Sequence, residues 1–227
     1  MERKYYNAYD DRYRQVHREK LKWFDDKPSP VVGEIISKFG ISEKDRILEI
    51  GCGEGRDAAF LLDKGYDLLA TDVSPEAIGF CRSTFQKHQE KFRILDCVTG
   101  ALDDRFDFIY AVAVLHMLVP DGDRDRFYTF IRRHLQQTGI ALICTMGDGS
   151  TERQTDIRTA FDLQQRLHEG TGKMLEIANT SCRMVSFETF IDELKRNRLS
   201  VLAQGISDSV PGFHKMMYAV VRRQETM

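Results

Sequence analysis

The sequence lacks a long apolar run and a basic segment, and each absence argues against a class of function. A membrane-spanning helix needs about 20 consecutive apolar residues, and no such run occurs in the 227 residues. The N-terminus has no apolar stretch typical of a signal peptide. The chain carries 33 basic and 35 acidic residues, whereas nucleic-acid-binding domains usually carry a basic excess. We therefore expect a cytoplasmic protein without a membrane or nucleic-acid partner.

Cysteine and histidine also lack the spacings of disulfide frameworks and metal sites. The five cysteines are scattered and odd in number, and none stand in C-x-x-C spacing, which favours reduced thiols. The six histidines form neither H-x-x-x-H nor H-E-x-x-H, so no metal is predicted. The hydrophobic fraction of 42% is ordinary for a globular protein, and we predict one domain over residues 1–227.

What the sequence does contain is an apolar run followed by alternating glycines, within residues 46–61. Residues 47–50 are apolar except for Glu49, which suits a buried strand, and the residues after Arg56 offer the apolar face of a helix. Glycines stand between them at 51, 53 and 55. They allow close approach of the backbone to a ligand, and the following helix N-terminus favours an anionic group. The dinucleotide fingerprint G-x-G-x-x-G would place its third glycine at Arg56.

The rest of the chain alternates between predicted strands and helices. Strands are predicted at 66–71, 92–95, 106–114, 140–146, 199–206 and 213–222, and helices at 30–39, 56–64, 75–86, 123–138 and 187–194. The unbroken apolarity of 106–114 indicates the centre of a sheet. Residues 207–212 are too few for a crossover helix, so the last two strands must pair antiparallel.

Two acidic residues end predicted strands. Asp72 lies 21 positions after Gly51, where an acid accepts hydrogen bonds from ribose hydroxyls. The alternative for Asp72 is a helix cap, but Ser74 already supplies one for the next helix. Asp96 follows the third strand, and its alternative is a turn residue. Asp72 supports an adenosine ligand without distinguishing between cofactor classes.

Residues 1–28 are predicted to form a helical cover. Tyr6, Tyr9 and Tyr13 follow helical spacing, and packing on the body would explain them. The functional alternative is that Tyr5, Tyr9 or Tyr13 lines the active site, because tyrosine combines apolar area with a polar tip. The Trp23 side chain either lines a pocket or packs in the protein interior without contact to a ligand.

Residues 147–185 exceed what a compact domain needs and predict an inserted lid. Thr151 and Gln154 match a capping box, and helical spacing relates Ile157, Ala160, Phe161, Gln164 and Leu167. We predict a helix here over the carboxyl end of the sheet, with Phe161 and Met146 near the substrate. The alternative is that this segment packs on the surface of the domain and does not contact the substrate. Residues 173–185 are predicted to add a strand or an extended cover.

Over about residues 31–223 the sequence resembles the class I S-adenosylmethionine-dependent methyltransferases. The resemblance rests on an acidic residue before G-x-G-x-G, on Asp72 and Asp96, on the apolar residues 106–114 and on the closing hairpin. Residues 23–29 and the glycine motif resemble the small-molecule branches, near the thiopurine and tellurite methyltransferases. The resemblance implies an α/β, Rossmann-like doubly wound sheet of seven strands, with the last strand antiparallel and helices on both faces. It implies S-adenosyl-L-methionine as cofactor, S-adenosyl-L-homocysteine as product, and direct in-line transfer to a small-molecule N, O or S acceptor.

The same resemblance implies a set of cofactor-binding residues. Asp72 would hold the ribose, Asp96 and Cys97 the adenine, and Glu49 would favour the cofactor ammonium, with Ala111 near the methionine part. His116 is the candidate general base, since histidine titrates near neutrality, and its alternative is a structural loop histidine. The full predicted set is Glu49, Gly51, Cys52, Gly53, Gly55, Arg56, Asp72, Val73, Asp96, Cys97, Ala111 and His116.

Two other functions remain open at this point. A nicotinamide oxidoreductase would use a similar glycine turn, but Arg56 and the closing hairpin disfavour it. A non-catalytic adenosylmethionine-binding module would use residues 147–185 as an interface with a partner protein. The chain is expected to be a monomer or a homodimer, because the tyrosine face of 1–28 can pack within one chain or between two.

Overall fold

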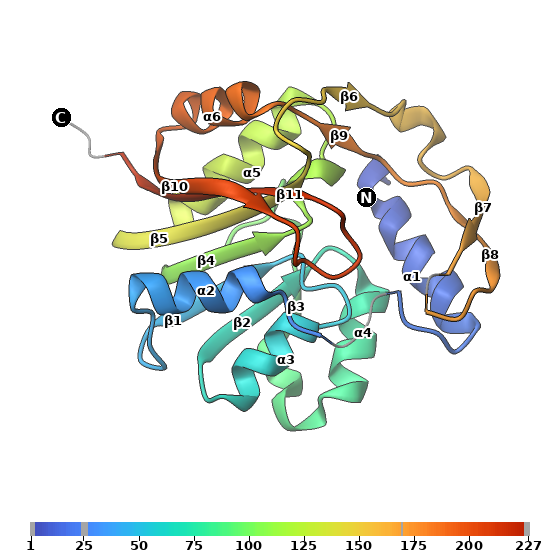
Figure 1. Ribbon diagram of the computed structural model, residues 1–227. Coiled ribbons are helices and arrows are strands. Elements are labelled where there is room, and N and C mark those ends of the chain that lie inside the picture. Colours follow the sequence, from blue (N-terminus) through green and yellow to red (C-terminus); the bar gives the residue numbers. More distant parts are fainter. Residues whose placement is uncertain (1–2, 24–26, 169, 225–227) are drawn as a thin grey trace.

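Seven strands form the central sheet in the order β10-β11-β5-β4-β1-β2-β3 (Figure 1). This computed structural model describes residues 3–23, 27–168 and 170–224. The strands of this sheet are β1 (Arg46–Ile50), β2 (Asp67–Asp72), β3 (Phe92–Ile94), β4 (Phe106–Val112), β5 (Leu135–Met146), β10 (Leu199–Ser207) and β11 (Met216–Arg223). The main helices are α1 (Ala8–Arg18), α2 (Pro30–Phe39), α3 (Arg56–Asp63), α4 (Pro75–Thr84), α5 (Asp121–His134) and α6 (Phe187–Arg196).

The topology places a switch point beside β1. β1 pairs in parallel with β2 on one side and with β4 on the other, so the chain leaves β1 and β4 in opposite directions across the sheet. β11 pairs antiparallel with both β5 and β10. In such sheets ligands bind outside the carboxyl ends of the strands at the switch point. The predicted seven-stranded sheet with an antiparallel last strand is confirmed.

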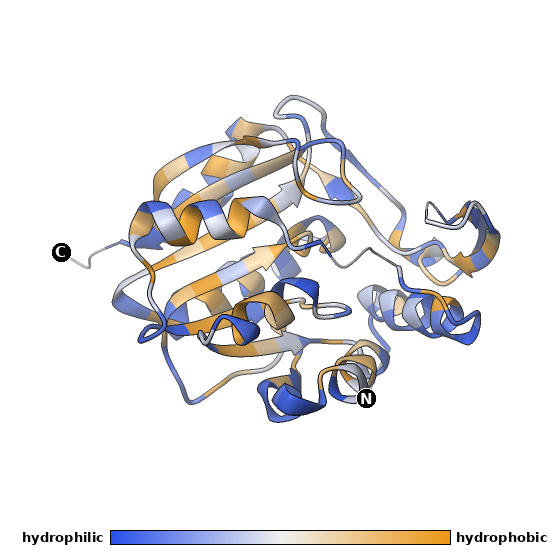
Figure 2. Cartoon of the chain, turned by 60° about the horizontal axis from the view of Figure 1, so that its bottom comes forward, coloured by the Kyte–Doolittle hydropathy of each residue, from blue (hydrophilic) through white to orange (hydrophobic). Residues whose placement is uncertain are grey.

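Two hydrophobic clusters fill the space between the sheet and its helices. Residues of α2, α3 and α4 form the cluster on one face, and residues of α5 and α6 form the other. Figure 2 shows hydrophobic residues concentrated along the strands. β4 is almost wholly buried, as its unbroken apolar sequence predicts for a strand covered on both faces.

The helix predicted at 151–167 is absent, which corrects that expectation. The chain instead forms β6 (Arg153–Gln154), a short 3-10 turn η4 (Ile157–Thr159) and β7 (Leu163–Leu167). β7 pairs antiparallel with β8 (Met174–Ala178), and β6 pairs with β9 (Arg183–Met184). The Thr151 hydroxyl donates to Asp148 Oδ2 rather than capping a helix. Pairing with β8 satisfies the β7 backbone, and such tertiary pairing overrides a helical side-chain pattern. The extra strand predicted within 173–185 is confirmed.

Two boundary details also differ from expectation. Ser29 precedes α2 but does not cap it, because its hydroxyl donates to Asp57 Oδ2 at 2.8 Å. α5 ends at His134, before the predicted end at 138–139, and β5 begins directly at Leu135. Leu135 is fully buried and pairs with Phe106 of β4. It is therefore part of a strand, although the apolar face of a longer helix would bury it equally well.

The N-terminal helix and the β6–β9 segment lie together at one end of the molecule (Figure 1). The Arg12 guanidinium of α1 donates to the carbonyl oxygens of Ala178 and Asn179, and Gln15 Oε1 accepts from the Ala178 amide at 2.7 Å. We call α1 with residues 153–184 the cover. Residues 1–2, 24–26 and 169 of the predicted cover and lid lie outside the described residues. Among the described residues no helix has the length and apolarity to cross a membrane.

Candidate functional site

The glycine loop between β1 and α3 has a backbone that only glycine fits. Gly51, Gly53 and Gly55 have φ values of 73°, 52° and 79°, in the left-handed region that side chains disfavour. A Cβ on Gly51 would lie 2.3 Å from Val114 Cγ2, and one on Gly53 would lie 2.6 Å from the Tyr13 hydroxyl. The loop is therefore a tight cradle beneath α1 and the end of β4.

Asp72 ties the tip of β2 to this cradle. Its Oδ2 accepts from the Gly53 amide at 2.9 Å and its Oδ1 from the Ser74 amide at 2.8 Å. Burial raises the pKa of the Asp72 carboxyl, while these two hydrogen bonds act in the opposite direction. The predicted placement beside the glycine loop is observed, and the carboxylate is oriented by backbone on both of its oxygens.

Two adjoining cavities open at the carboxyl edge of the sheet. The smaller has a volume of about 60 Å³ and the larger of about 460 Å³. Both cavities are lined by Tyr9, Tyr13, Gly51 and Met117. They therefore meet at the glycine loop, beneath α1.

The smaller cavity brings together the predicted adenosine residues. Asp72, Val73, Asp96 and Cys97 all line it. Asp96 Oδ1 accepts from the Val98 amide at 2.8 Å. Burial raises the pKa of the Cys97 thiol, so it stays protonated at neutral pH.

Tyr6 also lines the smaller cavity, and its hydroxyl donates to Asp96 Oδ2 at 2.9 Å. The prediction named Tyr5 instead, which lines neither cavity among the described residues and donates to Asp123 Oδ2 at 2.9 Å. The spacing of Tyr6, Tyr9 and Tyr13 on one helical face was the signal that would have selected Tyr6 over Tyr5.

The larger cavity receives most of the other predicted residues. Those that line it are Glu49, Cys52, Gly53, Arg56, His116, Tyr9, Tyr13, Trp23 and Met146. Glu49 is 4% exposed, and its Oε2 has no hydrogen-bond partner among the described residues. Burial, with Asp57 nearby, raises the pKa of Glu49 well above its usual range. Arg56 donates to Ser29 Oγ at 3.0 Å and to the Pro211 carbonyl at 3.3 Å, so it joins two loops beside the cavity.

His116 reaches the larger cavity from η3 (Leu115–Met117), just beyond β4. Burial and the charges of Arg124 and Arg12 lower its pKa to about 3. The imidazole is therefore neutral at neutral pH. Its Nδ1 is buried without a hydrogen-bond partner in the described part of the chain.

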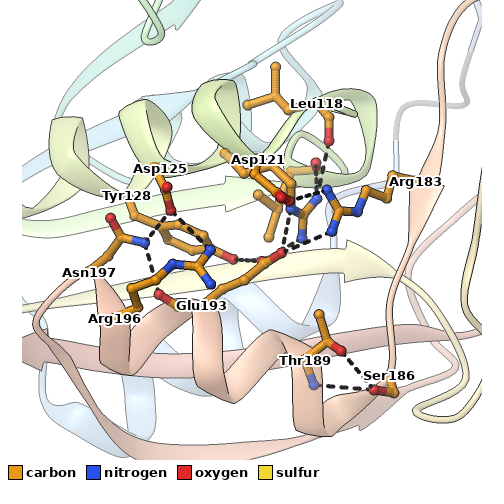
Figure 3. A network of polar contacts seen from close by, with 12 residues as sticks. Leu118, Asp121, Asp125, Tyr128, Arg183, Ser186, Thr189, Glu193, Arg196 and Asn197 are labelled. Atoms are coloured by element: carbon orange, nitrogen blue, oxygen red, sulfur yellow. Dashed lines mark hydrogen bonds and ion pairs between the residues drawn. The ribbon is translucent and has the colours of Figure 1, made fainter.

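A buried ion pair fixes the segment that carries His116 (Figure 3). Arg124 of α5 is fully buried, and its Nη1 donates to the carbonyl oxygens of Leu115 and Leu118 at 2.9 and 3.2 Å. Its Nε and Nη2 donate to the two carboxylate oxygens of Glu193 at 2.8 and 2.7 Å. The Tyr128 hydroxyl also donates to Glu193. Because the guanidinium binds carbonyls on both sides of His116, it sets the position of that residue.

Besides Tyr5, the predicted residues Gly55, Ala111 and Phe161 line neither cavity. Ala111 is fully buried in the core and pairs with Ile143 of β5, while Val112 and Ala113 beyond it line the larger cavity. The alternation of side chains along β4 turns Ala111 into the core. Phe161 packs under the Arg3 guanidinium at 4.1 Å. None of the three lines the site, which corrects those expectations.

Three arginines are among the lining residues that the sequence did not predict. Arg12, Arg153 and Arg166 line the larger cavity from α1, β6 and β7. They are far apart in sequence and belong to no motif, so no local pattern could have found them.

The fold and a family comparison together define the class of protein. Residues 47–139 match the family model described as a methyltransferase domain. This match covers the glycine loop, Asp72 and Asp96, and the sheet order is that of the class I methyltransferases. The predicted resemblance to the class I methyltransferases is therefore confirmed.

The chain is also similar to individual proteins over part of their length. The chain is 30% identical over 105 residues to Hemagglutinin 1 of Eikenella corrodens, covering 45% of this chain and 35% of that protein. It is 24% identical over 110 residues to the probable S-adenosyl-L-methionine-dependent methyltransferase TehB of Haemophilus influenzae, covering 48% and 37%. The chain thus spans little more than a third of the length of these relatives.

Among solved structures, the fold matches the Burkholderia thailandensis 1,6-didemethyltoxoflavin-N1-methyltransferase with bound 1,6-didemethyltoxoflavin and S-adenosylhomocysteine. The TM-score is 0.68 at 18% identity, covering 99% of this chain and 92% of the other. At this identity the match shows a common fold that includes the cover, and no more.

Proposed function

We propose that this protein transfers the methyl group of S-adenosyl-L-methionine to a small-molecule nucleophile. The observation that carries the proposal is the meeting of two cavities at the glycine loop, one lined by Asp72 and Asp96 and the other by Glu49. Asp72 and Asp96 would bind the cofactor's nucleoside, and the larger cavity would take its amino-acid part together with a second molecule. The bound S-adenosylhomocysteine of the Burkholderia enzyme and the name of TehB support this choice of cofactor.

The residues present fit this cofactor on three observations. The cradle at Gly51 and Gly53 leaves no room for a Cβ, as a backbone that approaches a ligand requires. Glu49 Oε2 is a buried acceptor without a partner among the described residues, and an ammonium group would satisfy it. The Asp72 carboxylate lies at the end of β2, where an acidic residue accepts hydrogen bonds from the ribose hydroxyls.

The chain's contribution to the reaction is binding, orientation and the exclusion of water. When bound, the cofactor supplies an activated methyl group on a sulfonium. Tyr9 and Tyr13 of α1 line both cavities and separate the site from solvent. Holding two molecules in near-attack geometry supplies a large part of the rate in such transfers. We propose that residues 1–28 cover this site and that residues 147–185 act as its lid, within one domain.

The proposal is tested by calorimetric titration with S-adenosylhomocysteine, followed by assays of its release from S-adenosylmethionine with small thiols, amines, carboxylates and oxyanions. Binding followed by turnover on one chemical class is expected, and no binding would overturn the proposal. Binding without turnover on any acceptor would favour a regulatory module that presents residues 147–185 to a partner. A nicotinamide cofactor in the same titration serves as the negative control.

We expect replacement of His116 with alanine to lower kcat by about tenfold, which is less than the hundredfold or more typical of a general base, because a group of such low pKa is a weak base. Affinity for S-adenosylhomocysteine should stay within about twofold. With a pKa of about 3, His116 should not produce a fall in wild-type kcat as the pH drops through about 6.5. The measurement is kcat against pH for both proteins, and an unchanged kcat would remove His116 from the mechanism.

A further inference from the structure

The two walls of the larger cavity differ in how their charges are paired. The wall beside the glycine loop carries Glu49, Glu54 and Asp57. Glu54 accepts from the Trp23 amide at 2.8 Å and faces His17 Nε2 at 3.0 Å. Asp57 accepts from the Ser29 hydroxyl and lies 3.8 Å from Arg56 Nε. The charges of Glu54 and Asp57 are therefore already compensated within the protein.

The opposite wall belongs to the cover and carries three arginines, Arg12, Arg153 and Arg166. None of them forms an ion pair with a carboxylate of the described residues, whereas Arg158, between β6 and β7, pairs with Asp156 at 2.6 Å. Arg153 donates only to the sulfur of Met184, at 3.1 Å. This wall therefore presents positive charge that the described part of the protein leaves uncompensated.

Arg12 is the buried member of this group, with only 6% of its surface exposed. Its Nε and Nη2 donate to backbone carbonyls of the cover and to Thr180 Oγ1 at 2.6 Å. Its Nη1 has no acceptor among the described residues. A buried guanidinium with a free donor on a cavity wall is costly unless a ligand completes its hydrogen bonds.

Arg12 and Arg166 converge on one aromatic ring. Their guanidinium carbons lie 5.0 and 5.1 Å from the centre of the Trp23 ring. Burial, together with the charge of Arg166, lowers the pKa of Arg12 to about 10, so Arg12 remains charged at neutral pH. An anion between them would relieve their repulsion, and the guanidinium fork matches a carboxylate in geometry.

We propose that the methyl acceptor carries a carboxylate or comparable oxyanion that binds Arg12, Arg153 and Arg166. This inference rests on the proposed function, because it takes the occupant of the larger cavity to be the acceptor. The anion on the cover wall directs the rest of the molecule toward the glycine loop, past Met117 and Met146, which also line the cavity. The cover thus selects the substrate as well as closing the site.

Trp23 makes the test direct, because it is the single tryptophan of the chain, and it lines the cavity in contact with the guanidiniums of Arg12 and Arg166. Protein saturated with S-adenosylhomocysteine is titrated with matched pairs, benzoate against benzamide and nicotinate against nicotinamide, while its fluorescence is followed. Each acid is expected to bind about tenfold more tightly than its amide, as a charge-assisted contact implies. Raising the salt concentration should reduce this preference.

Two variants and a control assign the preference to the cover. Arg166→Gln removes a guanidinium that makes no ion pair in the described structure, and should reduce the preference to about threefold or less. Arg12→Gln should do the same but also removes the bonds to Ala178 and Asn179, so its melting temperature is measured alongside. Arg158→Gln lies on the same segment, is paired with Asp156 and lines neither cavity, and should keep the full preference.

Equal affinities for acid and amide, or no fluorescence response to either acid, would overturn the inference. So would a preference that survives in Arg166→Gln and Arg12→Gln alike. The proposed function is tested separately by the calorimetric titration with S-adenosylhomocysteine. Binding of that ligand without an acid preference would leave the methyltransferase standing and remove only the anionic acceptor.

Discussion

Replacing Arg124 with methionine is expected to lower the free energy of unfolding by about 3–5 kcal/mol, the cost of removing one partner of a buried ion pair. The Glu193 carboxylate is 2% exposed and would lose both guanidinium contacts. The carbonyl oxygens of Leu115 and Leu118 would lose their donor as well. Denaturant unfolding of the two proteins measures the difference.

The control for this prediction is a surface pair from the same region. Arg196, more than half exposed, pairs with Asp125 at 3.2 Å, and Arg196→Met should cost about 1 kcal/mol or less. Adding Glu193→Leu to Arg124→Met should recover part of the loss, because the buried charge is then gone. A cost for Arg124→Met as small as that of the surface variant would contradict the assigned role of the pair.

Replacing Asp72 with alanine is expected to weaken binding of S-adenosylhomocysteine by about a hundredfold. Hydrogen bonds to a charged group contribute about 1.5–3 kcal/mol each, and the ribose hydroxyls would donate up to two to this carboxylate. The variant also releases the Gly53 amide, which the carboxylate holds at 2.9 Å, and so loosens the cradle. Calorimetric titration of the folded variant gives the affinity.

Asp67 provides the matched control for Asp72. It lies at the opposite end of β2, is half exposed and pairs with Lys91 at 3.0 Å. Asp67→Ala should leave the affinity within about twofold of the wild type, as expected for a surface charge away from the ligand. Asp72→Asn retains one acceptor oxygen and should fall between the two. If Asp72→Ala binds as tightly as Asp67→Ala, Asp72 does not hold the ribose.

Sequence reasoning succeeded where the signal is local. The glycine loop is recognisable because its left-handed backbone demands glycine at fixed spacing. Asp72 and Asp96 follow apolar runs, and parallel strands bring their carboxyl ends to one edge. The closing hairpin follows from a connection too short for a crossover. These features place most of the predicted cofactor residues around two adjoining cavities, with Gly55 and Ala111 the exceptions.

The sequence by itself determined the sheet, its antiparallel last strand and the loop that cradles a ligand, because periodicity, glycine and chain length act over a few residues. Only the tertiary structure decided that residues 163–167 form a strand. Their local pattern fits a helix as well, and the strand depends on pairing with β8. The tertiary structure alone brought Arg12, Arg153 and Arg166 onto one wall. Their convergence depends on the packing of α1 against a segment about 140 residues further along the chain, and no local pattern records such a contact.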